Sequence, residues 1–281
     1  MGMGENIIGC LNYYGFGDPI NILAIFANSH NGYIVYSIVF ILRVYLAGFS
    51  ALLYSKEMGF NAKASVIGAI AYSFCGFAIY GGLMHIEWLA VLFYFPLMIT
   101  GAEMVIKGKH YKALFVFSIM YGALCGFYYL YMSSIILAVY CIIRLAFINR
   151  LSALRNTLNT IALLLALYSI GIILASPFLL PSINAFLNSE RNGNIVSIIT
   201  DHTLYIPMPH LIRDFFKCSI KVTDTYAMGI GIAEWLLIAI SIFMPNSSKN
   251  LQLKISLLLA SIAVSVPITY WLFNGFGESN S

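Results

Sequence analysis

The residues of this chain that could carry out acid–base chemistry are few, because only 9% of the residues are charged. His85 and Glu87 stand two positions apart in the stretch GLMHIEWLA, where they could act as an acid–base pair or hold a cation. The alternative is a solvated helix start, at which the helix dipole favours Glu87. Asp18 is a third catalytic candidate, and its alternative role is the N-cap of a helix with Pro19 at the first position.

A second group of residues could bind a substrate. Tyr128 and Tyr129 could stack against a sugar ring, although aromatic side chains also anchor helix ends at the membrane interface. Arg191 could bind a phosphate, because a guanidinium matches phosphate oxygens bidentately, and Ser189 lies beside it in the sequence. Asn6 lies in an N-terminal segment that is free to meet a substrate, unless that segment is merely frayed.

The composition determines which kind of protein must position these residues. The chain has 281 residues, of which 60% are hydrophobic, and its mean hydropathy is +0.87. Soluble domains are about 25% charged, so this chain lacks the charge to cover a soluble fold, and its hydrophobicity excludes disorder. Its apolar runs are long and continuous, which predicts an all-α polytopic membrane protein rather than a β-barrel. No basic cluster indicates nucleic-acid binding, and the five dispersed cysteines indicate neither a metal nor a redox site.

Eight segments are long enough to be membrane-spanning helices, which need about 20 apolar residues. The fourth segment, 112–127, and the fifth, 128–148, are short and meet at a tight turn within residues 126–132. Pro177 and Pro181 are expected to end the sixth segment, 158–180. The predicted organisation is an outer loop over 1–32 with a short interfacial helix, transmembrane helices over 33–180, an outer loop over 181–226 with an amphipathic helix, and two further spans with an outer tail over 227–281. The predicted spans are 33–54, 66–83, 87–106, 112–127, 128–148, 158–180, 227–244 and 252–272.

The distribution of basic residues predicts the orientation. Ten of the fifteen Lys and Arg residues fall in the loops 55–65, 107–112, 144–155 and 245–254, and four fall in the alternate loops. The positive-inside rule therefore predicts that both termini lie outside. An outer N-terminal segment without a preceding span predicts that upstream helices are missing and that the chain is an internal fragment. The long loops would then face outward, where an enzyme has no nucleotide sugars and must use a lipid-linked donor.

Three charges fall within or near the predicted spans. Arg43 lies mid-way along the first span, and Glu103 and Glu234 lie nearer the edges of theirs. A charge at the centre of the membrane costs about 2.5–3.5 kcal/mol on insertion scales, so such residues pair or line a cavity. We expect either a structural pair between Arg43 and Glu234 or a polar path for a substrate head group or a proton.

Seven stretches, in order along nearly the whole chain, carry a family resemblance. They are ENIIGCLNYYGFGDPINIL, RVYLAGFSALLY, IAYSFCGFAIY, FPLMITGAEMVIKGK, GFYYLYM, LLPSINAFLNSERNG and FNGF. Together they resemble the YfhO-type bacterial multi-spanning membrane proteins, a family similar to the GT-C glycosyltransferases. The resemblance implies a GT-C-like fold and an enzyme that decorates cell-envelope glycopolymers such as teichoic acids. It also implies that the essential carboxylate lies in an earlier outer loop that this sequence does not include. The residues that it makes substrate-facing are Asn6, Asp18, Tyr128, Tyr129, Ser189 and Arg191.

The leading hypothesis is therefore that the chain lies in the bacterial cell membrane and is part of a glycosyltransferase. This enzyme would move a sugar from a polyprenyl-phosphate donor to a cell-envelope glycopolymer. A carboxylate would deprotonate the acceptor hydroxyl, and a cation or an arginine would stabilise the departing lipid phosphate. The alternatives are a non-catalytic membrane subunit, a decayed fragment, and a transporter or flippase, which would need broken helices in two repeated halves. The expected partners are the lipid bilayer, the lipid-linked sugar and the glycopolymer acceptor. No motif requires a cofactor, and a divalent cation is the one candidate.

Overall fold

The computed structural model describes residues 15–82, 85–149 and 154–187, together with single positions between 240 and 255. Within these ranges the regular structure is entirely helical. The chain divides into two compact units, and the unit described below comprises Met1–Phe74 and Ala78–Asn188. The predicted spans 227–244 and 252–272 and the amphipathic helix of the loop 181–226 lie outside the described residues, apart from a few single helical positions.

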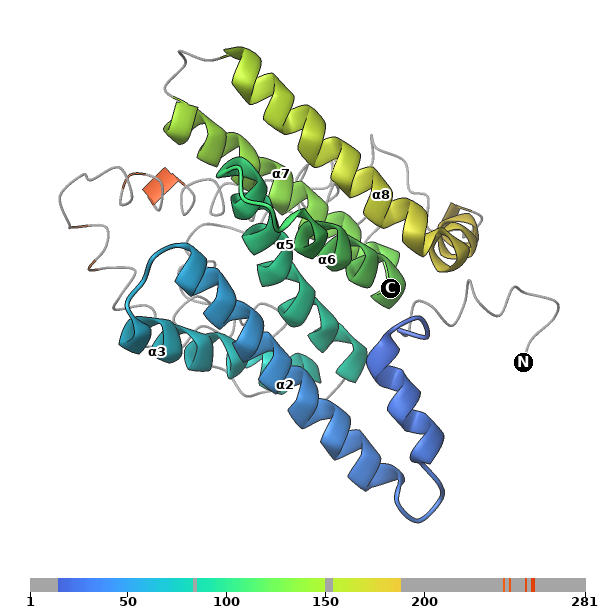
Figure 1. The fold of residues 1–281 in the computed structure, drawn as a ribbon. Helices are drawn as coiled ribbons and strands as arrows, with labels where there is room; N and C mark the ends of the chain where they lie inside the picture. The colour runs from blue at the N-terminus through green and yellow to red at the C-terminus, as the bar shows by residue number, and fades with distance from the viewer. Residues whose placement is uncertain are drawn as a thin grey trace, which may run out of the picture. The chain divides into compact units, whose positions relative to one another are not determined.

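The first described element is a short helix that lies against a long one. The 3₁₀-helix η1 (Pro19–Phe26) and the start of α2 (Gly32–Glu57) form a helical hairpin, drawn in blue in Figure 1. The Asp18 side chain caps η1 by accepting a hydrogen bond of 2.9 Å from the Ile20 N–H, and Pro19 occupies the first turn. The short helix predicted after Asp18 and Pro19 is therefore confirmed.

The second predicted span, 66–83, is not one helix. The helix α3 (Ala62–Ser73) begins after the N-cap Asn61 and covers about 18 Å at roughly 1.5 Å per residue, which is shorter than the hydrocarbon layer of about 30 Å. A π-helix, η2 (Phe77–Gly81), follows after a break. Gly82, directly after η2, packs so closely against Leu89 and Phe40 that an added Cβ would lie 2.8 Å from both side chains. The helix predicted over 66–83 is therefore interrupted between α3 and η2.

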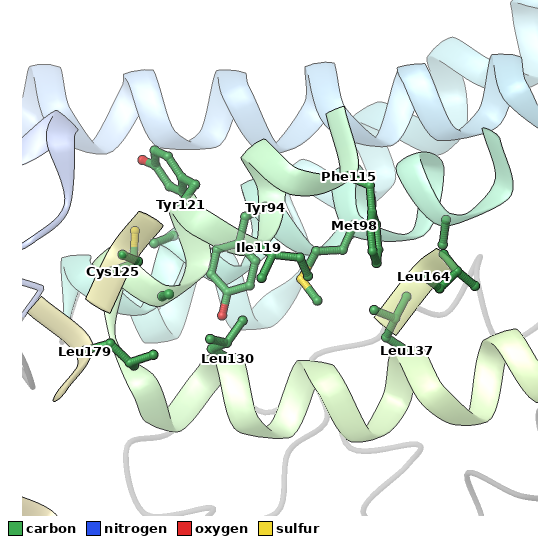
Figure 2. Close-up of a cluster of buried hydrophobic side chains, with 14 of the residues drawn as sticks. Tyr94, Met98, Phe115, Ile119, Tyr121, Cys125, Leu130, Leu137, Leu164 and Leu179 are labelled. Carbon is green, nitrogen blue, oxygen red and sulfur yellow. The ribbon is translucent and has the colours of Figure 1, made fainter. Parts of the chain in front are cut away.

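The helix α5 (Ala90–Ile106) is the centre of the described bundle. It follows the 3₁₀-helix η3 (Ile86–Leu89), and 72% of the span that they form together is buried, against 22–28% for the other candidate spans. The helices α6 (Lys112–Cys125), α7 (Phe127–Asn149) and α8 (Leu154–Leu187) share its apolar core. Figure 2 shows this core, which includes Tyr94, Met98, Phe115, Ile119, Leu130, Leu137, Leu164 and Leu179.

The packed pairs show that the helices alternate in direction. Cys125, Leu130 and Leu179 lie at one end of the core, and Phe115, Leu137 and Leu164 lie at the other (Figure 2). The helix α7 therefore runs opposite to α6 and α8. Gly101 of α5 lies against Phe115 of α6, and an added Cβ at Gly101 would lie 2.6 Å from the Phe115 Cα, so a glycine allows the two backbones to approach.

The turn between α6 and α7 is shorter than predicted. Gly126 alone breaks the helix, with a φ of 155°, and α7 begins at Phe127. Glycine suits this position because other residues rarely adopt a positive φ. The predicted break at this place is confirmed, but Tyr128 and Tyr129 lie in the first turn of α7 rather than in the turn.

The helix α8 also differs from its predicted length. It continues through Pro177 and Pro181 to Leu187, so the prediction that these prolines end the span is wrong. Prolines are tolerated inside membrane helices, because neighbouring groups and local adjustments satisfy the freed backbone groups. Within the described residues, four helices are long and apolar enough to cross a membrane, and Lys112–Cys125 is a shorter apolar helix.

Three of the predicted basic loops lie at the same end of this unit. Glu57 Oε1 accepts a hydrogen bond of 2.9 Å from Lys107 Nζ, and its Oε2 accepts one of 2.7 Å from Lys109 Nζ. The fully buried Glu103 accepts hydrogen bonds from Arg144 Nη2 at 2.8 Å and Nε, and from the Tyr140 hydroxyl at 2.7 Å. These six residues, Glu57, Glu103, Lys107, Lys109, Tyr140 and Arg144, are called the basic-end cluster below.

A proline in the central helix holds two neighbouring helices in place. Pro96 has no N–H, so it cannot donate the usual helical hydrogen bond to the carbonyl of Leu92. That carbonyl instead accepts a hydrogen bond of 3.1 Å from the hydroxyl of Tyr72 in α3, and a longer one of 3.3 Å from the hydroxyl of Ser50 in α2, which is shared with the Ala47 carbonyl at 2.8 Å. The helical irregularity at Pro96 therefore provides an acceptor that binds α2 and α3 to α5.

This arrangement predicts an interaction between substitutions at three positions. Replacing Ser50 by Ala together with Tyr72 by Phe leaves the Leu92 carbonyl without these donors, and should lower the free energy of unfolding by about 1–3 kcal/mol. In a Pro96→Ala background the restored N–H can donate to Leu92, so the same two changes should cost less. Unfolding of the purified protein in detergent measures both differences. An equal loss in the two backgrounds would contradict this role of Pro96.

Candidate functional site

A buried ion pair lies where η1, α2, η3 and α6 meet. Arg43 Nη2 lies 2.7 Å from Asp18 Oδ2, and the side chains of both residues are only 1% exposed. The same nitrogen donates a hydrogen bond of 2.7 Å to Asn21 Oδ1, and Arg43 Nη1 donates to the backbone carbonyl of Ile86. Asp18 Oδ1 accepts a hydrogen bond of 2.8 Å from the Tyr121 hydroxyl. We call Asp18, Asn21, Arg43 and Tyr121 the Asp18–Arg43 cluster.

The surroundings of Asp18 favour the structural alternative for this residue. Its carboxylate caps η1, binds Tyr121 and pairs with Arg43, all in a buried environment. A carboxylate engaged in this way is poorly placed to accept a proton from a substrate. The partner of Arg43 in the described residues is therefore Asp18, whereas Glu234, the partner predicted from the sequence, lies outside them.

The acid–base candidates His85 and Glu87 lie directly next to this cluster. His85 Nδ1 and Glu87 Oε1 are 3.1 Å apart, and the side chains are 45% and 15% exposed respectively. His85 has extended backbone dihedrals and precedes η3, and Glu87 is in the first turn of that helix. The two side chains therefore contact one another. The position of Glu87 in the first turn agrees with the helix-start alternative, although its side chain is only partly solvated.

A row of aromatic rings extends from His85. The His85 ring stacks on Trp88, with ring centroids 4.4 Å apart and an angle of 22° between the planes. Trp88 meets Tyr129 edge to face at 6.3 Å, and Tyr129 meets Tyr128 in the same manner at 5.6 Å. We call these four residues the aromatic row. The structure thus joins four residues selected from the sequence, namely His85, Glu87, Tyr128 and Tyr129, through Trp88, which was not selected.

A tight turn before η1 lies against the acid–base pair. Gly15 has a φ of 71°, and an added Cβ at Gly15 would lie 3.0 Å from the Glu87 Cβ. The Gly15 carbonyl accepts a hydrogen bond of 2.7 Å from Asn21 Nδ2 and one of 3.0 Å from the Asp18 N–H. The turn that presents Asp18 to Arg43 therefore also packs against Glu87.

The basic-end cluster does not offer a second acid–base site. In the basic-end cluster, the carboxylates of Glu57 and Glu103 are paired with Lys107, Lys109 and Arg144. Its components come from α2, from the end of α5 with the following loop, and from α7, so the cluster connects three helix ends. Glu103 was predicted to lie near the edge of its span, and this position is confirmed.

Several sequence candidates lie outside the described residues, namely Asn6, Ser189, Arg191 and Glu234. Among the residues that the structure does describe, no three His, Cys, Asp or Glu side chains gather as metal ligands.

The comparisons with known proteins identify a family of membrane proteins. The model of the family described as bacterial membrane protein YfhO matches residues 1–280. The chain belongs to the YfhO family. No curated protein and no solved structure matches it. Membership of a bacterial membrane protein family, together with the apolar helices, establishes a multi-pass membrane protein and confirms the resemblance noted from the sequence.

The burial of the Asp18–Arg43 pair predicts a strong coupling between its two members. Arg43→Met should lower the free energy of unfolding by about 3–5 kcal/mol, because it leaves the Asp18 carboxylate buried without a counter-charge. Asp18→Asn retains an oxygen that can cap η1, so adding it to Arg43→Met should recover part of the lost stability. Denaturant unfolding of the two single variants and the double variant in detergent measures the coupling. Simple additivity of the two single effects would contradict it.

Proposed function

We propose that this YfhO-family chain is part of an integral-membrane glycosyltransferase that moves a sugar from a polyprenyl-phosphate donor to a cell-envelope glycopolymer on the outer face of the bacterial membrane. The observation that carries the proposal is the contact between His85 and Glu87 beside the aromatic row. An acid–base pair can accept the proton of an acceptor hydroxyl, and an aromatic surface can pack against a sugar ring.

The orientation of the unit supports an outward position for this chemistry. The basic-end cluster joins loops that carry many of the Lys and Arg residues, and the positive-inside rule assigns such loops to the cytoplasm. The His85–Glu87 pair precedes α5, whereas Lys107 and Lys109 follow it, so the pair and these lysines lie at opposite ends of one helix. The pair then faces outward, where a lipid carrier is the available source of an activated sugar.

The proposed reaction is an inverting displacement at the anomeric carbon. The acceptor oxygen forms a bond to that carbon while the bond from the carbon to the phosphate oxygen breaks, and polyprenyl phosphate leaves. The proton of the acceptor hydroxyl passes to His85, whose ring Glu87 orients through Nδ1. Trp88 and Tyr129 hold the sugar. The positive charge that stabilises the departing phosphate would come from Arg191 or from a bound divalent metal.

The experiment compares transfer by the full chain with transfer by variants in washed membranes supplied with polyprenyl-phosphate-linked sugar and glycopolymer acceptor. His85→Ala and Glu87→Gln should each lower the rate by about 10²–10⁴-fold, the usual contribution of general acid–base catalysis. His110→Ala is the matched control, because His110 is an exposed histidine next to the basic-end cluster, and it should retain the parental rate.

Two results would contradict the proposal. Parental transfer by both His85→Ala and Glu87→Gln would show that the pair has no role in the chemistry. A lack of transfer by the parent chain across the donors and acceptors of the bacterial envelope would instead favour a non-catalytic membrane subunit.

A further inference from the structure

The Arg43 side chain links the Asp18 turn to the backbone between the two proposed acid–base residues. Its guanidinium is buried, with Nη2 directed at Asp18 and Asn21 and Nη1 at the carbonyl of Ile86. Ile86 is the residue between His85 and Glu87. Among the described residues, no hydrogen bond or ion pair joins the Arg43 side chain to the side chain of His85 or Glu87.

The segment that Arg43 holds has little support of its own. The helix η3 has four residues, and short 3₁₀-helices have poor hydrogen-bond geometry. His85 makes no side-chain capping bond to it. Two carbonyls of this segment are used locally, since His85 O accepts from Trp88 N at 3.0 Å and Glu87 O accepts from Ala90 N. The Ile86 carbonyl, which belongs to the same short helix, also binds a charged donor on another helix, the Arg43 guanidinium of α2.

The shape of the arginine head group fits this function. A guanidinium presents its donors in a rigid planar fork, whereas a lysine ammonium is a compact point charge on a flexible stem. A lysine at position 43 could keep a positive charge near Asp18, but it could not hold Asp18, Asn21 and the Ile86 carbonyl in one fixed geometry. The charge function and the positioning function of Arg43 can therefore be separated.

We infer that Arg43 is a positioning residue, which fixes the His85–Glu87 pair and the Trp88 ring by holding the Ile86 carbonyl while it is itself anchored by Asp18 and Asn21. This inference rests on the proposed function of the pair. Its geometric part, the position of His85 relative to Trp88, can be measured without any transferase assay.

The first experiment uses Trp88 as a fluorescent probe. Trp235→Phe and Trp271→Phe leave Trp88 as the single tryptophan of the full chain. His85 stacks on Trp88 at 4.4 Å, so its displacement should change the emission maximum and the quenching of Trp88 by acrylamide. Arg43→Lys should change both quantities toward those of His85→Ala. Arg144→Lys is the matched control, because it alters the arginine–carboxylate pair of the basic-end cluster, and it should leave both quantities at the parental values.

The second experiment measures the kinetics of the same variants. A misplaced acid–base pair should lower kcat by roughly 10²-fold, the loss that a displacement of about 1 Å can cause, with little change in KM for the lipid-linked sugar. Asn21→Ser provides a milder change, because it removes one anchor of Arg43, together with the Asn21 hydrogen bond to the Gly15 carbonyl, and retains both charges of the ion pair. It should alter Trp88 fluorescence and kcat in the same direction by a smaller amount.

The inference is overturned if Arg43→Lys and Asn21→Ser both retain the parental Trp88 fluorescence, or if Arg144→Lys changes that fluorescence as much as Arg43→Lys does. If the Arg43→Lys protein does not accumulate, the Trp88 fluorescence of Asn21→Ser decides: a change supports the inference, and the parental fluorescence overturns it. If the parent chain transfers no sugar, the proposed function fails, whereas the fluorescence comparison still tests the positioning by Arg43.

Discussion

The ion pair between Asp18 and Arg43 is the interaction on which the candidate site depends. A charge buried at this depth must be neutralised, and the pair achieves this through a turn that comes before α2 in the chain. The same turn packs Gly15 against Glu87, and the same guanidinium binds the carbonyl between His85 and Glu87. One electrostatic requirement thus brings η1, α2 and η3 together, and Tyr121 adds α6.

Outside this cluster, different interactions hold the helices together at different positions along α5. In the middle of α5, the carbonyl freed by Pro96 binds hydroxyls from α2 and α3. Close approach at Gly101 allows α6 to pack on α5, and the basic-end cluster joins α2, α5 and α7 at the far end. Polar contacts suit this task in a membrane, where apolar side chains gain little by leaving lipid for one another. The structure therefore places its few polar groups where helices must be held in register.

The sequence predicts the helices better than it predicts the breaks between them. Hydropathy located the spans near α2, α5, α7 and α8, because an apolar run of sufficient length has few other stable forms in a bilayer. It missed the end of α3 at Ser73 and the continuation of α8 through Pro181 to Leu187, since the apolar character of a segment does not determine where its backbone leaves the helix. At the site, spacing alone identified His85 and Glu87. Asn21, Trp88 and Tyr121 could not be selected, because their role arises from contacts between distant segments; the HIEW tetrapeptide was the one local signal for Trp88.

The central claim is that the Asp18–Arg43 end of the unit, with the His85–Glu87 pair, faces the outside of the cell. Single cysteines introduced at Ser29, in the turn before α2, and at His110, beside the basic-end cluster, test it in a chain whose five native cysteines are replaced. Intact cells are treated with a membrane-impermeant maleimide, and labelling is compared before and after lysis. The account predicts that position 29 is labelled on intact cells and that position 110 is labelled only after lysis. The reverse pattern would place the acid–base pair toward the cytoplasm and contradict the account.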